Sequence, residues 1–174
     1  GAVVVNTFLA SAAGGIATMF YTYFSYGKID ITMVINGILA GLVSITAGCN
    51  VVGPISAIFI GLIAGILVDL AVLFFDKIKV DDPVGAVAVH GVNGLFGTVA
   101  VGFFAAEGGL LFGGGVALLI TQLIGVVTIG LFSFSITFIL MKVLKSTIGI
   151  RISSEEEEAG IDSVSFGVKS YTNE

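Results

Sequence analysis

Five apolar stretches constrain the fold of this chain more than any other feature of its sequence. A helix needs about 20 apolar residues to cross a hydrocarbon core of roughly 30 Å, because each residue adds about 1.5 Å. Of the 174 residues, 56% are hydrophobic and 11% are charged, which excludes an ordinary soluble domain. We predict an all-α membrane protein, with a polytopic helical bundle over residues 1–145 and a polar tail over residues 146–174. The predicted spans are residues 1–24, 31–49, 54–75, 84–104 and 112–141.

The basic residues predict the orientation of this bundle, because cytoplasmic loops of membrane proteins carry an excess of Lys and Arg. The two loops after the second and fourth spans, residues 49–53 and 105–109, contain neither. We therefore expect a multi-pass protein of the cell membrane with its carboxyl-terminal tail in the cytoplasm and Gly1 toward the outside. The basic residues follow the first, third and fifth spans: Lys28, Lys77, Lys79, Lys142, Lys145, Arg151 and Lys169.

Glycines inside the spans predict close helix packing. Gly37 and Gly41 in the second span, and Gly61 and Gly65 in the third, have the small-xxx-small spacing that lets membrane helices approach each other. The alternative is generic packing without a specific partner helix. The chain opens on an apolar run without a Met, so we also expect it to be a piece of a longer polypeptide.

His90 is the only histidine, and it lies inside an apolar run. An ionisable side chain at membrane depth is costly unless it faces a cavity or a partner, so it is a candidate functional residue. Asp82 followed by Pro83 is typical of a helix start, which would put His90 about eight residues, or roughly 12 Å, into the fourth span. At i+4 and i+7, Gly94 and Gly97 are expected on the same face. The alternative is a structural histidine that hydrogen-bonds to backbone carbonyls of packed helices.

The other polar residues of the spans indicate no enzyme chemistry. A neutral imidazole can donate and accept a hydrogen bond and can carry a proton, but a single histidine cannot hold a metal ion alone. Cys49 is the only cysteine, and no catalytic triad, phosphate loop or nucleic-acid-binding patch is found. We therefore expect neither an enzyme nor a bound cofactor or metal. Asp69 could reach the membrane interface, hydrogen-bond a neighbouring helix, pair with Lys77 or Lys79, or take part in transport.

Two short sequences resemble the ammonium transporter (Amt/Mep/Rh) family. They are Val-Asp-Asp-Pro at residues 80–83 and Val-His-Gly-Val-Asn-Gly-Leu-Phe-Gly at residues 89–97, and the sequence at residues 45–50 is also similar. The resemblance covers essentially the whole chain and implies the last five helices of an eleven-helix fold with an inverted repeat. It further implies a homotrimer with one pore per subunit. His90 would be one of two facing pore histidines and Ala86 a pore-lining position, with the amino-terminal half of the transporter supplying the other wall.

The tail is also similar to the cytoplasmic tail of that family. The similarity lies in the sequence from Arg151 through Gly160 to Asp162, and it implies a regulatory segment that contacts a neighbouring subunit and a PII-type signalling protein. The chain departs from the family pattern further on. Phe-Gly-Val stands at residues 166–168 in place of a common His-Gly-Glu, and Ser-Tyr at residues 170–171 in place of Ala-Tyr.

The resemblance implies passage of ammonium or ammonia across the membrane. A bare cation in a low-dielectric pore costs many kcal/mol, whereas neutral ammonia costs far less, so the substrate is expected to lose its proton on entry. His90 would then hydrogen-bond the neutral molecule or relay the proton. Two alternatives are a channel for small neutral solutes, in which the histidine is part of the wall, and a membrane ammonium sensor that signals through its tail.

Overall fold

The computed structural model describes residues 1–168, which are helical apart from loops, turns and one isolated β-bridge. The predicted all-α fold is therefore confirmed for this part of the chain. Lys169, Ser170 and Tyr171 lie outside the described residues. The chain divides into two units, Gly1–Ile129, which contains the helical bundle, and Gly130–Glu174, which contains the end of the last long helix and the tail.

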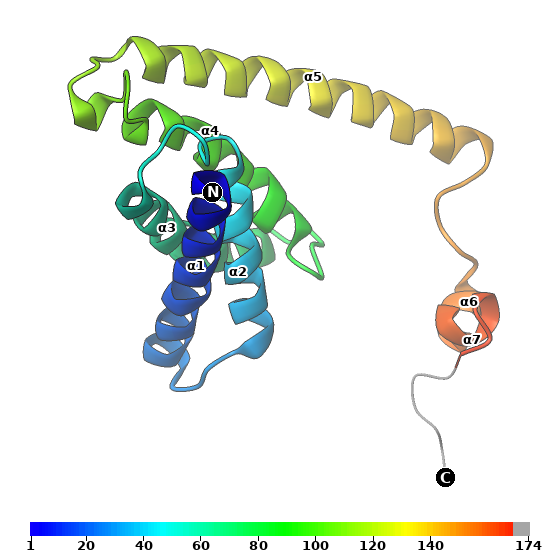
Figure 1. Cartoon of the computed structure of the whole chain (residues 1–174). Helices are drawn as coiled ribbons and strands as arrows, with labels where there is room; N and C mark the ends of the chain where they lie inside the picture. Colours follow the sequence, from blue (N-terminus) through cyan, green and yellow to red (C-terminus); the bar gives the residue numbers. More distant parts are fainter. Residues whose placement is uncertain (169–174) are drawn as a thin grey trace. The chain divides into compact units, whose positions relative to one another are not determined.

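Three helices form the centre of the first unit: α1 (Ala2–Tyr26), α2 (Ile31–Thr46) and α3 (Pro54–Lys77), each in contact with the other two (Figure 1). Each boundary has a local cause. Gly27 ends α1 in the left-handed conformation, with φ of 69°. The carboxylate of Asp30 caps α2 by accepting a hydrogen bond from the Met33 N–H at 3.1 Å, and Pro54 occupies the first turn of α3.

Glycines allow the backbones of these three helices to touch, as their spacing predicted. A Cβ atom on Gly41 or Gly61 would collide with the carbonyl group of Ala10 in α1, and one on Gly65 would collide with the carbonyl of Gly14. The core between the helices is accordingly built from small side chains such as Ala10, Ala40 and Ala64. In a bilayer, the hydrophobic effect does not drive helices together as it does in soluble proteins. Van der Waals contact between closely packed backbones takes its place.

The second predicted span is shorter in the structure than in the sequence-based prediction. Residues 47–50 form a turn, so α2 contains 16 residues, and this extends about 24 Å. Within residues 1–168, four helical segments are long and apolar enough to cross a membrane, and α2 is a shorter apolar helix beside them. The four are Ala2–Tyr26, Pro54–Lys77, Val87–Phe104 and Ala117–Thr147.

The fourth segment starts later than predicted and is not a uniform α-helix. Residues 83–84 form a turn, and the π-helical segment η1 (Val87–Val92) leads directly into α4 (Asn93–Phe104). His90 is thus the fourth residue of η1, and the predicted depth of eight residues is wrong. Gly85, with φ of 73°, provides the physical reason, since this left-handed turn prevents a helix from continuing back to Pro83.

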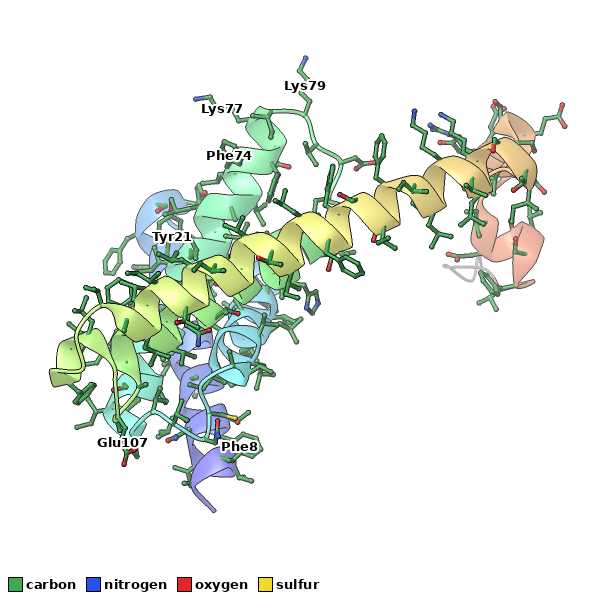
Figure 2. The ribbon with its side chains drawn as sticks, turned by 90° about the horizontal axis from the view of Figure 1, so that it is seen from above. Phe8, Tyr21, Phe74, Lys77, Lys79 and Glu107 are labelled. Carbon is green, nitrogen blue, oxygen red and sulfur yellow. The ribbon has the colours of Figure 1, made fainter. Side chains whose placement is uncertain are left out.

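The loops at the opposite end of the bundle from Lys77 and Lys79 are joined by polar contacts. The side-chain amide of Asn6 donates hydrogen bonds to the carbonyls of Cys49 and Val52, at 2.9 and 2.8 Å. Val52 also forms the isolated β-bridge with Ala105. Figure 2 shows Phe8 and Glu107 at this end, far from Lys77 and Lys79.

The remaining elements are the short 3-10 helix η2 (Leu110–Phe112), the long helix α5 (Ala117–Thr147), and two tail helices, α6 (Ser154–Ala159) and α7 (Ile161–Ser165). None of the residues of α5 is buried within the chain. Its exposed surface is made largely of Ile, Leu, Val and Phe, as is the outside of α1 and α3. Such a surface suits contact with lipid or with other membrane helices.

Candidate functional site

His90 lies on the outside of the bundle, on the π-helical segment η1. Its side chain is exposed, and no hydrogen bond from its ring to another residue is found within residues 1–168. Ala86, four residues earlier, is exposed as well. Both predicted pathway residues therefore face away from the core of this chain. The ring is therefore accessible to a ligand or a neighbouring helix. The alternative prediction was a structural histidine that hydrogen-bonds to backbone carbonyls, and no such bond is found within residues 1–168.

Asp82 fixes the start of the His90 segment. One oxygen of its carboxylate accepts hydrogen bonds from the backbone N–H groups of Val87 and Ala88, at 2.9 and 3.1 Å. These donors lie in the first turn of the helix, where backbone N–H groups have no partner within the helix. The carboxylate reaches them across the turn at Gly85, where any other residue would be strained and its Cβ would meet the Asn36 side chain at 2.9 Å.

Asn93 ties the same segment to α2. Its buried side-chain amide donates to the carbonyl of Ala88 at 3.0 Å, which satisfies one acceptor of the π-helical segment. The hydroxyl of Ser44 donates to the Asn93 backbone carbonyl at 3.1 Å and lies 3.3 Å from its side-chain oxygen. A π-helical turn often marks a functional site, and here it is held by side chains rather than by backbone alone.

The two glycines expected beside His90 lie elsewhere. Gly97 is buried against α2, where a Cβ atom would collide with Ser44, and Gly94 is half-buried with Val43 as its nearest neighbour. The predicted glycine-lined face around His90 is therefore wrong. The physical reason is the π-helical segment, which has more residues per turn than an α-helix and rotates the following residues toward α2.

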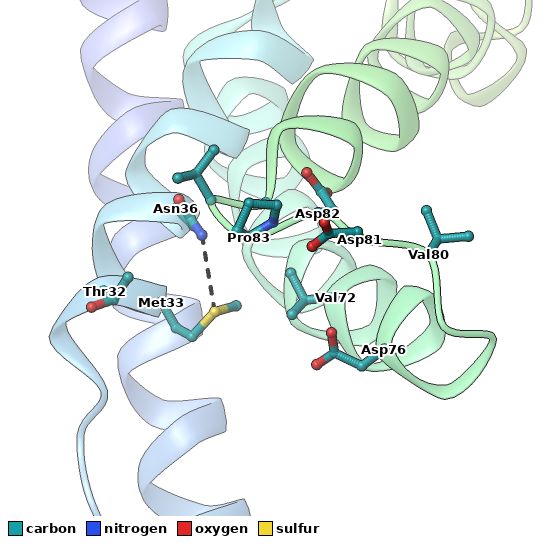
Figure 3. A pocket seen from close by; sticks show the side chains of 11 residues that line it. Thr32, Met33, Asn36, Val72, Asp76, Val80, Asp81, Asp82 and Pro83 are labelled. Atoms are coloured by element: carbon teal, nitrogen blue, oxygen red, sulfur yellow. Dashed lines mark hydrogen bonds between the residues drawn. The ribbon is translucent and has the colours of Figure 1, made fainter. Parts of the chain in front are cut away.

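A cavity of about 220 Å³ lies beside the turn that precedes η1 (Figure 3). Met33 and Asn36 of α2 form one side, joined by a long contact of 4.0 Å between the amide nitrogen and the sulfur, and Val72 of α3 lies opposite. Asp81 and Asp82 also line it. Within the described part of the chain, no group of three or more His, Cys, Asp or Glu residues that could hold a metal ion is found.

Asp69 is buried in the bundle, with 2% of its surface exposed. Neighbouring helices therefore enclose its side chain, and no ion pair with Lys77 or Lys79 is found within residues 1–168. One of its carboxylate oxygens is buried without a hydrogen-bond partner. Of the four fates that the sequence suggested for this side chain, contact with a neighbouring helix agrees with this burial, and a role in transport stays a prediction.

The tail residues form their own local structure. Arg151 lies 3.6 Å from Glu157, but both side chains are more than half exposed, so this ion pair contributes little stability. Gly160, with φ of 85°, separates α6 from α7, and Asp162 lies in the first turn of α7.

A capping box starts α6. The backbone N–H and the hydroxyl of Ser153 both donate to the Glu156 carboxylate, at 3.0 and 2.9 Å, and these bonds lower the pKa of Glu156 below its usual value. The Glu156 N–H in turn lies 3.2 Å from the Ser153 hydroxyl oxygen and donates to it.

Comparison with known proteins places these features in a family. A model described as the Ammonium Transporter Family matches residues 1–171. The chain is 39% identical to ammonium transporter Amt2 of Archaeoglobus fulgidus over 97% of its length, and 37% identical to an ammonium transporter of Mycobacterium bovis over 98%. In both cases it spans 38% of the length of the relative.

Solved structures give the same result for the fold. The chain superposes on a protein described as a sensor Amt protein with a TM-score of 0.87 and 39% identity, covering 95% of this chain and 42% of that one. It superposes on Saccharomyces cerevisiae Mep2 with a TM-score of 0.84 and 29% identity, covering 99% of this chain and 42% of that one. The helical arrangement is therefore that of a segment of these proteins.

Proposed function

The chain belongs to the ammonium transporter family, and we propose that it forms part of a pathway by which ammonium or ammonia crosses the membrane. His90 and Ala86 would line this pathway, because they lie together on an exposed face of the fourth helical segment. The opposite wall would come from helices other than the five of this chain. No bond-breaking chemistry is needed, since the substrate changes at most its protonation.

The observation that carries this proposal is the construction of the His90 segment. Asp82 and Asn93 hold the backbone around it by three hydrogen bonds, yet the imidazole itself has no partner within the described residues. A side chain that serves packing alone would be buried or bonded. A fixed backbone with a free polar ring is what a binding position requires, because the ring is aimed before the ligand arrives.

Electrostatic cost decides in which form the substrate passes His90. Transferring a small cation from water into an apolar pore costs far more than transferring a neutral amine, so release of the proton lowers the barrier. Neutral imidazole can accept a hydrogen bond from ammonia through one nitrogen and donate one through the other. It can also take up the proton, since its pKa in water lies near 6.5.

Replacement of His90 tests the proposal. In the complete protein, His90→Ala should lower the uptake of ammonium, or of its analogue methylammonium, at least about tenfold, because one hydrogen-bonded station is lost where no water replaces it. His90→Gln retains donors and acceptors but cannot carry a proton near neutral pH. It should therefore keep more uptake of neutral ammonia than His90→Ala while losing proton-coupled current.

Glu107→Gln is the matched control, because Glu107 is exposed and lies at the end of the bundle far from the basic loops (Figure 2). Its uptake should equal that of the unchanged protein. Uptake and ammonium-dependent current that are unaffected by both His90 variants would contradict the assignment of His90 to the pathway. Uptake without current in the unchanged protein would favour a channel for neutral solutes.

A membrane sensor is the second candidate, and one observation favours it. The solved structure with 39% identity that covers 95% of this chain is described as a sensor Amt protein. Ammonium binding that changes the tail without any uptake would support this function. For either function we further propose a homotrimer in the cell membrane, with a cytoplasmic tail that includes Arg151, Gly160 and Asp162. A PII-type regulatory protein is a candidate partner for this tail, and cross-linking to such a protein tests it.

A further inference from the structure

A second cavity, of about 210 Å³, lies between α1, α2 and α3 and has no part in the pathway proposed above. It contains the buried Asp69 and the exposed Asp30, and it shares Met33 and Val72 with the cavity beside the turn but no residue with η1. Within residues 1–168, no Lys, Arg or His lines it. The complete lining is Tyr26, Asp30, Met33, Asp69, Val72 and Leu73.

The Asp69 carboxylate is the most unusual group in this cavity. It is 98% buried, since 2% of its surface is exposed, and its oxygen Oδ2 has no hydrogen-bond partner. The hydroxyl of Thr18 has one proton, for which the carbonyl of Gly65, at 2.8 Å, and the Asp69 side chain compete. Oδ2 therefore lacks the partner that buried polar atoms in proteins normally have.

We propose that this cavity binds a small monovalent cation, with the Asp69 carboxylate as its buried ligand and Asp30 at its mouth. Asp30 can cap α2 and bind the cation at the same time. One of its carboxylate oxygens accepts the hydrogen bond from the Met33 N–H at 3.1 Å, and the second oxygen remains for another partner. The volume exceeds that of a bare ion, since a water molecule occupies about 30 Å³. The cation is therefore held with several of its waters.

The number of ligands decides the charge of the ion. Ca²⁺ takes six to eight oxygen ligands, and Mg²⁺ requires near-octahedral geometry with one or two carboxylates plus phosphates. This cavity offers two carboxylates at its two ends and otherwise apolar or aromatic side chains, and no group of three acidic, His or Cys residues is found in the described part of the chain. A singly charged ion matches one buried negative charge and leaves no excess charge in the bundle.

Cation-dependent stability tests the proposal. The complete protein is purified in detergent, and its Tm is measured in rising sodium, potassium or ammonium chloride, with choline chloride added to keep the ionic strength constant. A ligand that binds only the folded state raises the Tm in a saturable manner. We expect such a rise with at least one small cation. Asp69→Asn should abolish it, and Asp30→Asn, which still caps α2, should raise the half-saturating concentration about tenfold.

Asp76→Asn is the matched control, because Asp76 lies on the same helix, is exposed, and does not line this cavity. It should respond like the unchanged protein. The proposal is overturned if no small cation differs from choline, or if the response persists in Asp69→Asn. If Asp69→Asn fails to fold, infrared spectra of the protein with ¹³C-labelled Asp decide. Exchange of choline for the cation must then shift a carboxylate band that is retained in both Asp30→Asn and Asp76→Asn.

Discussion

Asn93 determines the position of His90 without facing the proposed pathway. Its amide pairs the carbonyl of Ala88, and Ser44 anchors it to α2. Asn93→Ala would leave the buried Ala88 carbonyl without its partner, which costs about 1–3 kcal/mol. We expect the free energy of unfolding of the complete protein in detergent to fall by that amount. Ammonium uptake should fall as well, because the His90 ring loses its fixed orientation.

Thr98→Ala is the control for this effect. Thr98 lies five residues further along α4, and its hydroxyl bonds only to the Gly94 carbonyl of its own helix, at 3.0 Å. Its removal should change stability by less than about 0.5 kcal/mol. Equal effects of the two substitutions on stability and uptake would show that Asn93 is an ordinary helix residue rather than a positioning residue.

At the scale of the helices, the stability of the bundle depends on close contact between their backbones. Gly65 of α3 faces α1, where a Cβ atom would collide with the Gly14 carbonyl and lie 2.9 Å from the Cβ of Ala17. Gly65→Ala should therefore destabilise the bundle by about 1–3 kcal/mol, because overpacking pushes two backbones apart. The measurement is the thermal or denaturant-induced unfolding of the complete protein in detergent.

Gly94→Ala provides the comparison, since its nearest atom outside its own helix would be the Cγ1 of Val43 at an ordinary 3.8 Å. Alanine favours a helix over glycine by up to about 1 kcal/mol, so this variant should be as stable as the unchanged protein or slightly more stable. A Gly65→Ala variant that is equally stable would show that α1 and α3 do not rely on this contact.

The long elements could be predicted from the sequence because their apolar length alone requires a helix in lipid. The His90 segment could not be predicted in the same way. Its start is set by the left-handed Gly85 and by Asp82 acting five residues ahead, and its π-helical form depends on Asn93 and Ser44, which are 49 positions apart. No local pattern encodes such a contact. The burial of Asp69 likewise depends on which face of α3 meets α1.

At the scale of the whole molecule, the two ends of the first unit differ in their basic residues. Lys77 and Lys79 lie at one end, and Glu107 lies at the other (Figure 2). The positive-inside rule assigns the lysine end to the cytoplasm. The outside of the bundle between these ends is apolar, which agrees with a multi-pass membrane protein of the ammonium transporter family.

Labelling of single cysteines tests this orientation. In the complete protein with its other cysteines replaced, Glu107→Cys should react with a membrane-impermeant maleimide added to intact cells, because that loop is exposed and is expected to face outward. Lys79→Cys, also on an exposed loop, should react only after the cells are permeabilised. Reaction of both variants in permeabilised cells controls for accessibility of the thiols. Labelling of Lys79→Cys in intact cells would reverse the orientation. The tail follows two spans after Lys79 and so lies on the same side, which would then be the outside, and Gly1 would lie in the cytoplasm.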